Sequence, residues 1–549
     1  MSLQFIIGGT GSDKTETIQD MVIRRSIQAP DKNYYMIVPE QYTMQTQAQM
    51  AGRHPGGGVM NIDIVSFPRL AYRVFDEVGN PLKTVLEDSG KRMVIRRILT
   101  ENRQHFDIFG GNIKKSGFIG EAKSMISELI QYQIRPEDLE QCSQSAGKET
   151  AFGKKLSDIR KLYEGFLDYL SDSFMTAEEL LDVLSDHVDD SEKLRDSEIY
   201  LDNFTGFTPT QYHLMERLLR ICSRVVISLT IDIRDRVQDP GKDYELFHLT
   251  KETLWKLEEM CRECHIEREE DMMLPSSKKG ELACLEKGIF RFGRRQVWDR
   301  EPEQIHIHML ESPEEEVGFT ARTILGMVRQ EGWSFRDFAV ITSDVSRYEA
   351  EVERQFEQLD IPVFIDQKRN LMANSFIEAL RSGMDTQLWD YSYESVMRYL
   401  RSGYSQVAEG DVDVLENYLL ATGVRGYSRW SKPFVRRGRR FQGDMFLEVN
   451  RIREEVLQEL APLREGMQQG QTVRDHCVAL YRFMENIQAE EQIKHYMLRF
   501  EEEGRLDLVR EYEQIYTSVI RLLEKCVDIL GDTWMTLEEF AEVLDAGFE

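Results

Sequence analysis

Near its amino end the sequence reads Leu3-Gln4-Phe5-Ile6-Ile7-Gly8-Gly9-Thr10-Gly11-Ser12-Asp13-Lys14-Thr15. The apolar run predicts a β-strand, the glycine-rich run predicts a turn, and residues 16–27 predict a helix. In this setting, backbone N–H groups and a lysine can hold the phosphates of a nucleotide. We therefore expect a P-loop, whose nucleotide-binding candidates are Gly8, Gly9, Thr10, Gly11, Ser12, Asp13, Lys14 and Thr15.

Asp13 is the one departure from the spacing Gly-x-x-x-x-Gly-Lys-[Ser/Thr], because it stands in place of the second glycine. A carboxylate about 4 Å from a phosphate charge is repelled by about 4 kcal/mol at an effective dielectric of about 20. The loop is therefore expected to bind ATP and magnesium weakly. A second interpretation is also open: Asp13 and Glu16 have the spacing of a helix start, in which Asp13 caps the free N–H groups and occupies the anion site itself.

Length and composition favour a large protein without membrane spans. At 549 residues we expect about three or four domains, and the sequence has no apolar run of about 18 residues and no signal peptide. The seven cysteines are scattered, which predicts free thiols in the cytoplasm. Cys261 and Cys264 form half of a zinc or haem motif, but no second ligand pair follows them, so we expect no metal site.

A net charge of −27 disfavours unspecific binding to a polyanion, so any contact with nucleic acid must be local. One basic stretch interrupts the acidic background and is interleaved with aromatic residues. Its DNA-binding candidates are Arg425, Arg429, Trp430, Arg436, Arg437, Arg439 and Arg440. Cations for phosphates beside aromatic rings for bases are typical of single-strand binding. A second interpretation is that the same residues form a solvated basic loop, which balances the charge of an acidic domain.

The hydrophobic pattern predicts an α/β fold in which the same scheme occurs twice. Strands and helices alternate at first, a region of helices alone follows, and the alternation of strands and helices then resumes. We expect a first core at 1–84 and 196–300, a helical insertion at 85–195, the start of a second core at 301–385, and a second helical insertion at 386–549. Strands of the second core are predicted at 305–310, 338–342 and 363–365.

Asp202 ends a predicted strand and fits the magnesium-holding acid of a P-loop core. The following residue is Asn203, which cannot act as a base. The sequence therefore combines a plausible nucleotide cradle with no hydrolytic carboxylate, and we identify no catalytic residue.

Several short motifs, in order over the first two thirds of the chain, resemble the AddB (RexB) component of the bacterial AddAB (RexAB) ATP-dependent helicase and deoxyribonuclease. They are the P-loop, Val38-Pro39-Glu40-Gln41, residues 65–73, residues 201–209 and residues 361–366. Their order also resembles that of a UvrD-like helicase. The resemblance implies two RecA-like P-loop cores, the second incomplete, and it implies that Ser66, Phe67 and Arg69 contact a DNA strand.

The resemblance further implies a DNA end-processing complex for recombinational repair, in which AddB reads the Chi sequence in single-stranded DNA next to the motor protein AddA (RexA). Family members carry a carboxy-terminal nuclease with an iron–sulfur cluster. This chain resembles only their front half, so it is expected to have no nuclease activity and little ATPase activity. Two other interpretations stay open: an active P-loop ATPase that tolerates Asp13, and a pure assembly scaffold.

Overall fold

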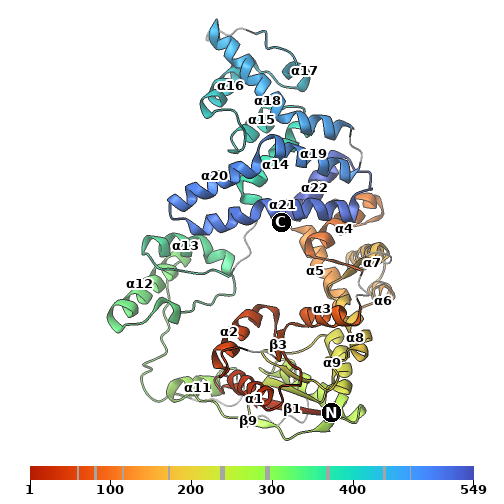
Figure 1. The fold of residues 1–549 in the computed structure, drawn as a ribbon, viewed down its shortest axis with the longest axis vertical. Coiled ribbons are helices and arrows are strands. Elements are labelled where there is room, and N and C mark those ends of the chain that lie inside the picture. Colours follow the sequence, from red (N-terminus) through yellow and green to blue (C-terminus); the bar gives the residue numbers. More distant parts are fainter. Residues whose placement is uncertain are drawn as a thin grey trace. The chain divides into compact units, whose positions relative to one another are not determined.

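The computed structural model describes residues 1–58, 61–79, 83–113, 117–170, 174–234, 241–290, 297–366, 371–436, 441–469 and 472–548 (Figure 1). It divides into two compact units. The first comprises Met1–Gly9, Asp13–Pro275 and Leu371–Glu549, and the second comprises Thr10–Ser12 and Ser276–Asn370. Within the described ranges, no helix combines the length and the apolar character that crossing a membrane requires.

A parallel sheet forms the centre of the α/β part of the first unit. Its strands are β1 (Ser2–Gly8), β2 (Tyr34–Ile37), β3 (Ile62–Val65), β6 (Glu198–Leu201), β7 (Arg224–Thr230), β8 (Glu267–Arg268) and β9 (Met272–Leu274). The order is β3-β2-β6-β7-β1-β8, and β9 also pairs with β1. One strand, β7, thus separates the strand before the glycine-rich loop from the strand before Asp202. This arrangement is consistent with a RecA-like core.

Helices cover both faces of this sheet, as the alternation of side chains in β1 requires. Leu3, Phe5 and Ile7 belong to an apolar cluster on one face that includes residues of four helices, whereas Ile6 packs on the other face with residues of two helices. The first group is α3 (Phe67–Val78), α8 (Glu179–His187), α9 (Pro209–Ile221) and α10 (His248–Glu263), and the second is α1 (Lys14–Gln28) and α2 (Thr43–Arg53). The predicted α/β pattern is therefore confirmed for this sheet.

The first insertion contains the predicted helices and also a small sheet that the sequence did not indicate. Strand β4 (Thr84–Leu86) pairs in parallel with β5 (Phe174–Thr176). The helices are α4 (Asp88–Glu101), α5 (Phe118–Gln131), α6 (Pro136–Ala146), α7 (Ala151–Leu170) and α8 (Glu179–His187). Short 3₁₀ turns occur in the first unit at Glu40–Tyr42, Arg103–His105, Phe109–Gly111, Val188–Asp190 and Leu371–Ala373.

The last part of the chain is helical, as predicted. Its helices are α14 (Ser375–Leu388), α15 (Tyr393–Leu400), α16 (Glu409–Thr422), α17 (Tyr427–Trp430), α18 (Asp444–Gln469), α19 (Val473–Asn486), α20 (Ala489–Glu502), α21 (Leu506–Leu530) and α22 (Leu537–Phe548). This bundle shares its core with the first insertion, because Met93 of α4 belongs to the same apolar cluster as Phe548. Arg96 and Glu542 form an ion pair of 2.5 Å across the same contact.

The second unit differs from the sequence prediction. It contains α11 (Gly280–Gly288), α12 (Pro313–Glu331) and α13 (Val345–Gln358), with a 3₁₀ turn at Phe335–Asp337. The structure describes residues 305–310, 338–342 and 363–365 in full, and none of them is in a strand. Apolar residues alternate there, but among the described residues no neighbouring strand accepts the backbone hydrogen bonds that would turn an extended run into a ladder.

Candidate nucleotide loop and nucleic-acid surface

The glycine-rich loop connects β1 to α1 as the sequence predicts. Lys14 starts the helix, and its Nζ donates a hydrogen bond of 2.9 Å to the carbonyl oxygen of Gly9. The lysine side chain thus folds back toward the start of the loop.

Asp13 occupies the N-cap position, but its side chain makes no capping hydrogen bond. The predicted side-chain cap by Asp13 is therefore wrong. The backbone of Asp13 is left-handed, with φ 54°, and its main-chain oxygen accepts bonds from Thr17 N at 2.9 Å and Thr17 Oγ1 at 2.8 Å. Glycine adopts a left-handed backbone most easily, which is why it is favoured at this position. Aspartate is one of the few other residues that tolerate this conformation. The exposed carboxylate stays in solvent at the loop.

Asp202 lies directly after β6 and is almost fully buried. Its carboxylate accepts hydrogen bonds from Ser228 Oγ of β7 and, at 3.2 Å, from Asn203 Nδ2. Asn203 has a positive φ of 66°, so the backbone turns sharply at the strand end. Two hydrogen-bond donors therefore fix the orientation of this buried carboxylate. The acid expected to hold magnesium is thus present and oriented, and the neighbouring amide faces the same carboxylate.

Ser66, Phe67 and Arg69 follow β3 at the carboxyl ends of the strands. Ser66 Oγ donates to the carboxylate of Glu40, and Arg69 Nε donates to the same carboxylate at 3.0 Å. Phe67 is only 3% exposed and packs on Phe204 with 5.4 Å between ring centroids. Of the three strand-contacting candidates, Arg69 alone has an exposed side chain, whereas Ser66 and Phe67 hold the surface beneath it.

A cavity of about 300 Å³ opens beside these residues. Phe67, Phe204 and Leu181 line its apolar part, and Thr208 and Gln211 lie among its polar groups. Thr208 also caps α9, so its position is fixed by a capping box with Gln211. Crevices at the carboxyl ends of parallel strands are the usual place for ligands in open α/β sheets.

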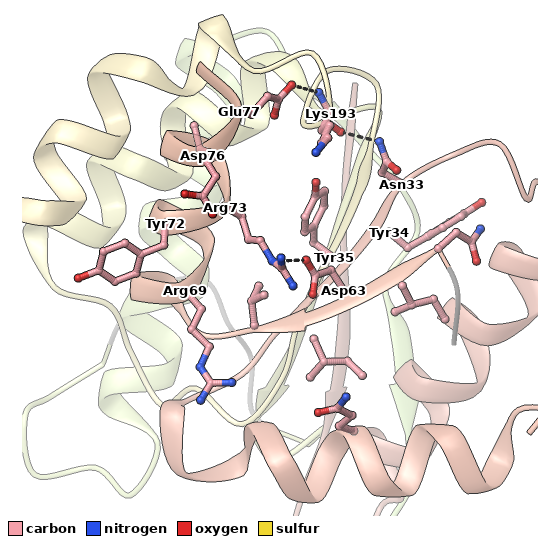
Figure 2. Close-up of a pocket in the computed structure, with 16 residues that line it drawn as sticks. Asn33, Tyr34, Tyr35, Asp63, Arg69, Tyr72, Arg73, Asp76, Glu77 and Lys193 are labelled. Carbon is pink, nitrogen blue, oxygen red and sulfur yellow. Dashed lines mark hydrogen bonds and ion pairs between the residues drawn. The ribbon is translucent and has the colours of Figure 1, made fainter. Parts of the chain in front are cut away.

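A larger hollow of about 720 Å³ lies along the edge strand β3, and Figure 2 shows its residues. Helix α3 contributes Arg69, Tyr72 and Arg73 to it, and Arg73 Nε pairs with Asp63 of β3 at 3.0 Å. Tyr35 lies behind this pair in Figure 2, where burial, followed by the nearby Asp63, raises the pKa of its hydroxyl to about 12.

Tyr72 and Arg73 were not among the residues predicted to contact DNA. They follow Arg69 by three and four positions, which places all three on one face of α3. Tyr72 is 43% exposed, and the side chains of Arg69 and Arg73 are also exposed. The helical spacing from Arg69 was the signal in the sequence that could have identified them.

The basic stretch of the last helical part separates into exposed cations and buried rings. Arg425, Arg429 and Arg436 are exposed, whereas Trp430 is 1% exposed and packs against Phe434 in the core. Trp430 therefore stabilises the bundle and presents no ring face to a base. Arg436 donates to the carbonyl oxygen of Thr422 at 2.9 Å. The remaining candidates, Arg437, Arg439 and Arg440, lie outside the described residues.

The parallel sheet and its strand order are consistent with the class of RecA-like cores. Residues 5–286 match the family model described as "ADDB, N-terminal". The chain therefore belongs to the AddB family and corresponds to its amino-terminal part.

Curated relatives are named as the B subunit of an ATP-dependent helicase/deoxyribonuclease. The protein of Lachnoclostridium phytofermentans is 34% identical over 561 residues, and that of Desulforudis audaxviator is 33% identical over 577 residues. The protein of Clostridium acetobutylicum is 31% identical over 565 residues. Each match covers 100% of this chain and 48–49% of the relative, so the chain spans about half the length of these relatives.

Proposed function

We propose that this chain is the helicase-like, non-motor part of an AddB protein that binds and scans single-stranded DNA in an end-processing helicase and nuclease complex. Its partner would be the motor protein AddA, in a cytoplasmic heterodimer that acts on DNA ends and single strands. Recognition of a Chi sequence belongs to this proposal. An iron–sulfur cluster and nuclease would belong to the carboxy-terminal half found in family members.

The observation that carries the proposal is the exposed face of α3 next to the cavity at the strand ends. Arg69 and Arg73 offer guanidinium groups for phosphates, and Tyr72 offers a ring on which a base can stack. Both arginines pair with carboxylates, Glu40 and Asp63, in the absence of DNA. A phosphate would replace these carboxylates, so binding is expected to depend on salt and to remain local on an acidic protein.

A binding experiment tests this surface. We expect Tyr72→Ala to weaken binding of a fluorescent oligothymidylate about tenfold, because stacking contributes about 1–3 kcal/mol per base. Arg73→Ala should weaken binding less and make its salt dependence shallower by about one phosphate contact. Arg499→Ala is the matched control, since Arg499 is an exposed helical arginine that pairs with Glu503 at 3.0 Å. Equal affinities for all three variants and the parent chain would refute the proposed surface.

The exposed cations Arg425, Arg429 and Arg436 form a second candidate contact. Changing them to Glu reverses three charges and leaves the buried Trp430 in place. A loss of single-strand affinity would assign the stretch to DNA, whereas unchanged affinity would leave it as a solvated loop. If neither this variant nor Tyr72→Ala affects DNA binding, the scaffold interpretation is favoured.

We expect the glycine-rich loop and Asp202 to bind nucleotide weakly and not to support its hydrolysis. Lys14 and the loop N–H groups would hold phosphates, and Asp202 would hold magnesium, while Asp13 opposes the added negative charge. We expect Asp13→Gly to tighten binding of a fluorescent ATP analogue about tenfold or more, by removing a repulsion of about 1–4 kcal/mol. ATP turnover at helicase rates that Lys14→Ala abolishes would instead identify an active ATPase.

A further inference from the structure

A short segment that follows β9 lies beside residues Thr10–Ser12 of the glycine-rich loop, within the same compact unit. Strand β9 pairs with β1 so that Gly8 lies opposite Leu274. The same register continues past both strand ends, where Ser276 Oγ donates to the carbonyl oxygen of Thr10 at 3.1 Å. Ser277 donates to the carbonyl oxygen of Gly11 twice, from its N–H at 2.7 Å and from its Oγ at 2.6 Å. We call residues Ser276–Lys278 the strap.

These bonds fix the direction of two peptide groups in the loop. In a trans peptide the C=O and the following N–H point in opposite directions, and the structure has no cis peptide among its described residues. Because the carbonyl oxygens of Thr10 and Gly11 point to the strap, the N–H groups of Gly11 and Ser12 point away from it. Phosphate-binding loops work by directing consecutive N–H groups to one side, toward the anion.

Gly11 fits closely between its own turn and the strap. Its φ is 74°, and a Cβ built there would lie 3.0 Å from Cε and 3.2 Å from Cγ of Lys278. The side chain of Lys278 therefore covers the tip of the loop, and its ammonium group is one bond beyond Cε. Lys278 thus packs on the strap side of the loop, opposite the side to which the N–H groups of Gly11 and Ser12 point.

We propose that the strap presets the loop for phosphate, with Ser277 as a positioning residue. The ligand class is a di- or triphosphate, as in pyrophosphate or a nucleotide. This inference rests on the proposed function only in taking Gly8 to Thr15 as a phosphate loop. It explains how hydrogen bonds from the strap, which is distant in sequence, fix the conformation of the loop although the Asp13 side chain makes no capping bond.

Calorimetric titration with inorganic pyrophosphate tests the strap, using the Asp13→Gly chain as the parent so that binding is strong enough to measure. We expect Ser277→Ala to weaken binding about threefold to fivefold, as the loss of one hydrogen bond predicts. Ser277→Pro also removes the N–H donor and should weaken binding about tenfold or more.

The control is Ser431→Ala, since Ser431 is an exposed serine whose Oγ also donates to a main-chain carbonyl. Its pyrophosphate affinity should equal that of the parent. Thermal unfolding of each variant separates positioning from stability: lower melting temperatures with unchanged pyrophosphate affinity would overturn the proposal. If Ser277→Pro does not fold, the pyrophosphate affinities of Ser277→Ala and Ser276→Ala decide whether the strap proposal holds.

Two further outcomes keep this inference distinct from the proposed function. An Asp13→Gly chain that binds no pyrophosphate overturns the strap proposal, while DNA binding through Tyr72 stays intact. If the chain does not bind DNA, but its affinity for pyrophosphate still falls when Ser277 is changed, the proposed function is refuted and the strap proposal is supported.

Discussion

The two regions for which the sequence predicts α/β structure take different forms. In the first, β1, β2, β6 and β7 pair in parallel, and their apolar side chains are buried. In the second, α12 and α13 form, but the extended runs before, between and after them leave Ile307 94%, Ile341 92% and Phe364 87% exposed. A helix satisfies its own backbone hydrogen bonds, whereas a strand depends on its neighbours. Hydrophobic periodicity therefore predicts helices correctly in both regions, but it predicts strands correctly only in the first region, where partner strands exist.

The largest expected difference is in amide hydrogen exchange. Amides of Ile6 and Val226 lie in paired strands and should exchange only on global unfolding, which corresponds to about 5–15 kcal/mol. Amides of Ile307 and Ile341 should exchange within seconds. Exchange measured by mass spectrometry on peptides from both regions checks this. Similar protection in the two regions would show that the second region forms a sheet in solution.

Matched isoleucines give the next largest effect. Ile227→Ala removes a side chain that is fully buried in β7, and we expect it to lower the free energy of unfolding by about 2–5 kcal/mol. Ile341→Ala changes a side chain that is 92% exposed, and it should alter the free energy by less than about 0.5 kcal/mol. Urea unfolding of both variants measures the contrast. A large cost at Ile341 would mean that this residue is covered in solution.

Ion pairs extend the comparison to charge. Arg25 donates to the buried Glu198 of β6 at 2.5 and 2.6 Å, whereas the pair of Arg354 and Glu314 in the second region is exposed. Burial alone would raise the pKa of Glu198, but hydrogen bonds from Arg25 and Tyr200 outweigh it and lower the pKa. This stabilisation is present above the ordinary glutamate pKa of 4.5 and is lost as the pH falls through the lowered value.

We therefore expect Arg25→Met to cost about 2 kcal/mol of unfolding free energy at pH 7 and much less near pH 3. Arg354→Met should have almost no effect at either pH. Denaturant unfolding of both variants at the two pH values provides the test. A cost for Arg25→Met that does not change with pH would show that the guanidinium acts by packing alone.

The smallest effect concerns the first turn of a helix in each region. Ser312 caps α12 by accepting a hydrogen bond from Glu315 N at 3.3 Å, and Thr208 caps α9 in the same way, from Gln211 N at 3.4 Å. We expect Ser312→Ala and Thr208→Ala each to cost about 1 kcal/mol. Local exchange rates in α12 and α9 measure these costs. A cost at Thr208 alone would mean that α12 is not a stable helix, and the second region would then differ in its helices as well.

Much of the first core was predictable, because local signals agreed with its tertiary structure. The strand, the glycine turn and Lys14 at the helix start follow from spacing, and so does the helix beginning at Pro209. The side-chain cap at Asp13 could not be judged, since a left-handed backbone turns the carboxylate away from the N–H groups it would cap. Burial of Trp430 depends on helices distant in sequence, so an aromatic residue among arginines resembled a surface motif.

The candidate site was predicted less completely than the fold. Arg69 was identified by a motif, but its neighbours Tyr72 and Arg73 required the helix that places them on one face. The strap required the pairing of β9 with β1, which joins residues more than 260 positions apart. No local pattern in Ser276-Ser277-Lys278 indicates such a contact.

The shared core of α4 and α22 has a consequence for synthesis of the chain on the ribosome. Met93 contacts the helix that carries Gly547 and Phe548, and more than 430 residues separate the end of α4 from the start of α22. At about 5–20 residues per second, that interval lasts roughly 20–90 s. Throughout it, the part of α4 that packs against α22 has no native partner. The core that the first insertion shares with the helical bundle therefore stays incomplete until α22 emerges.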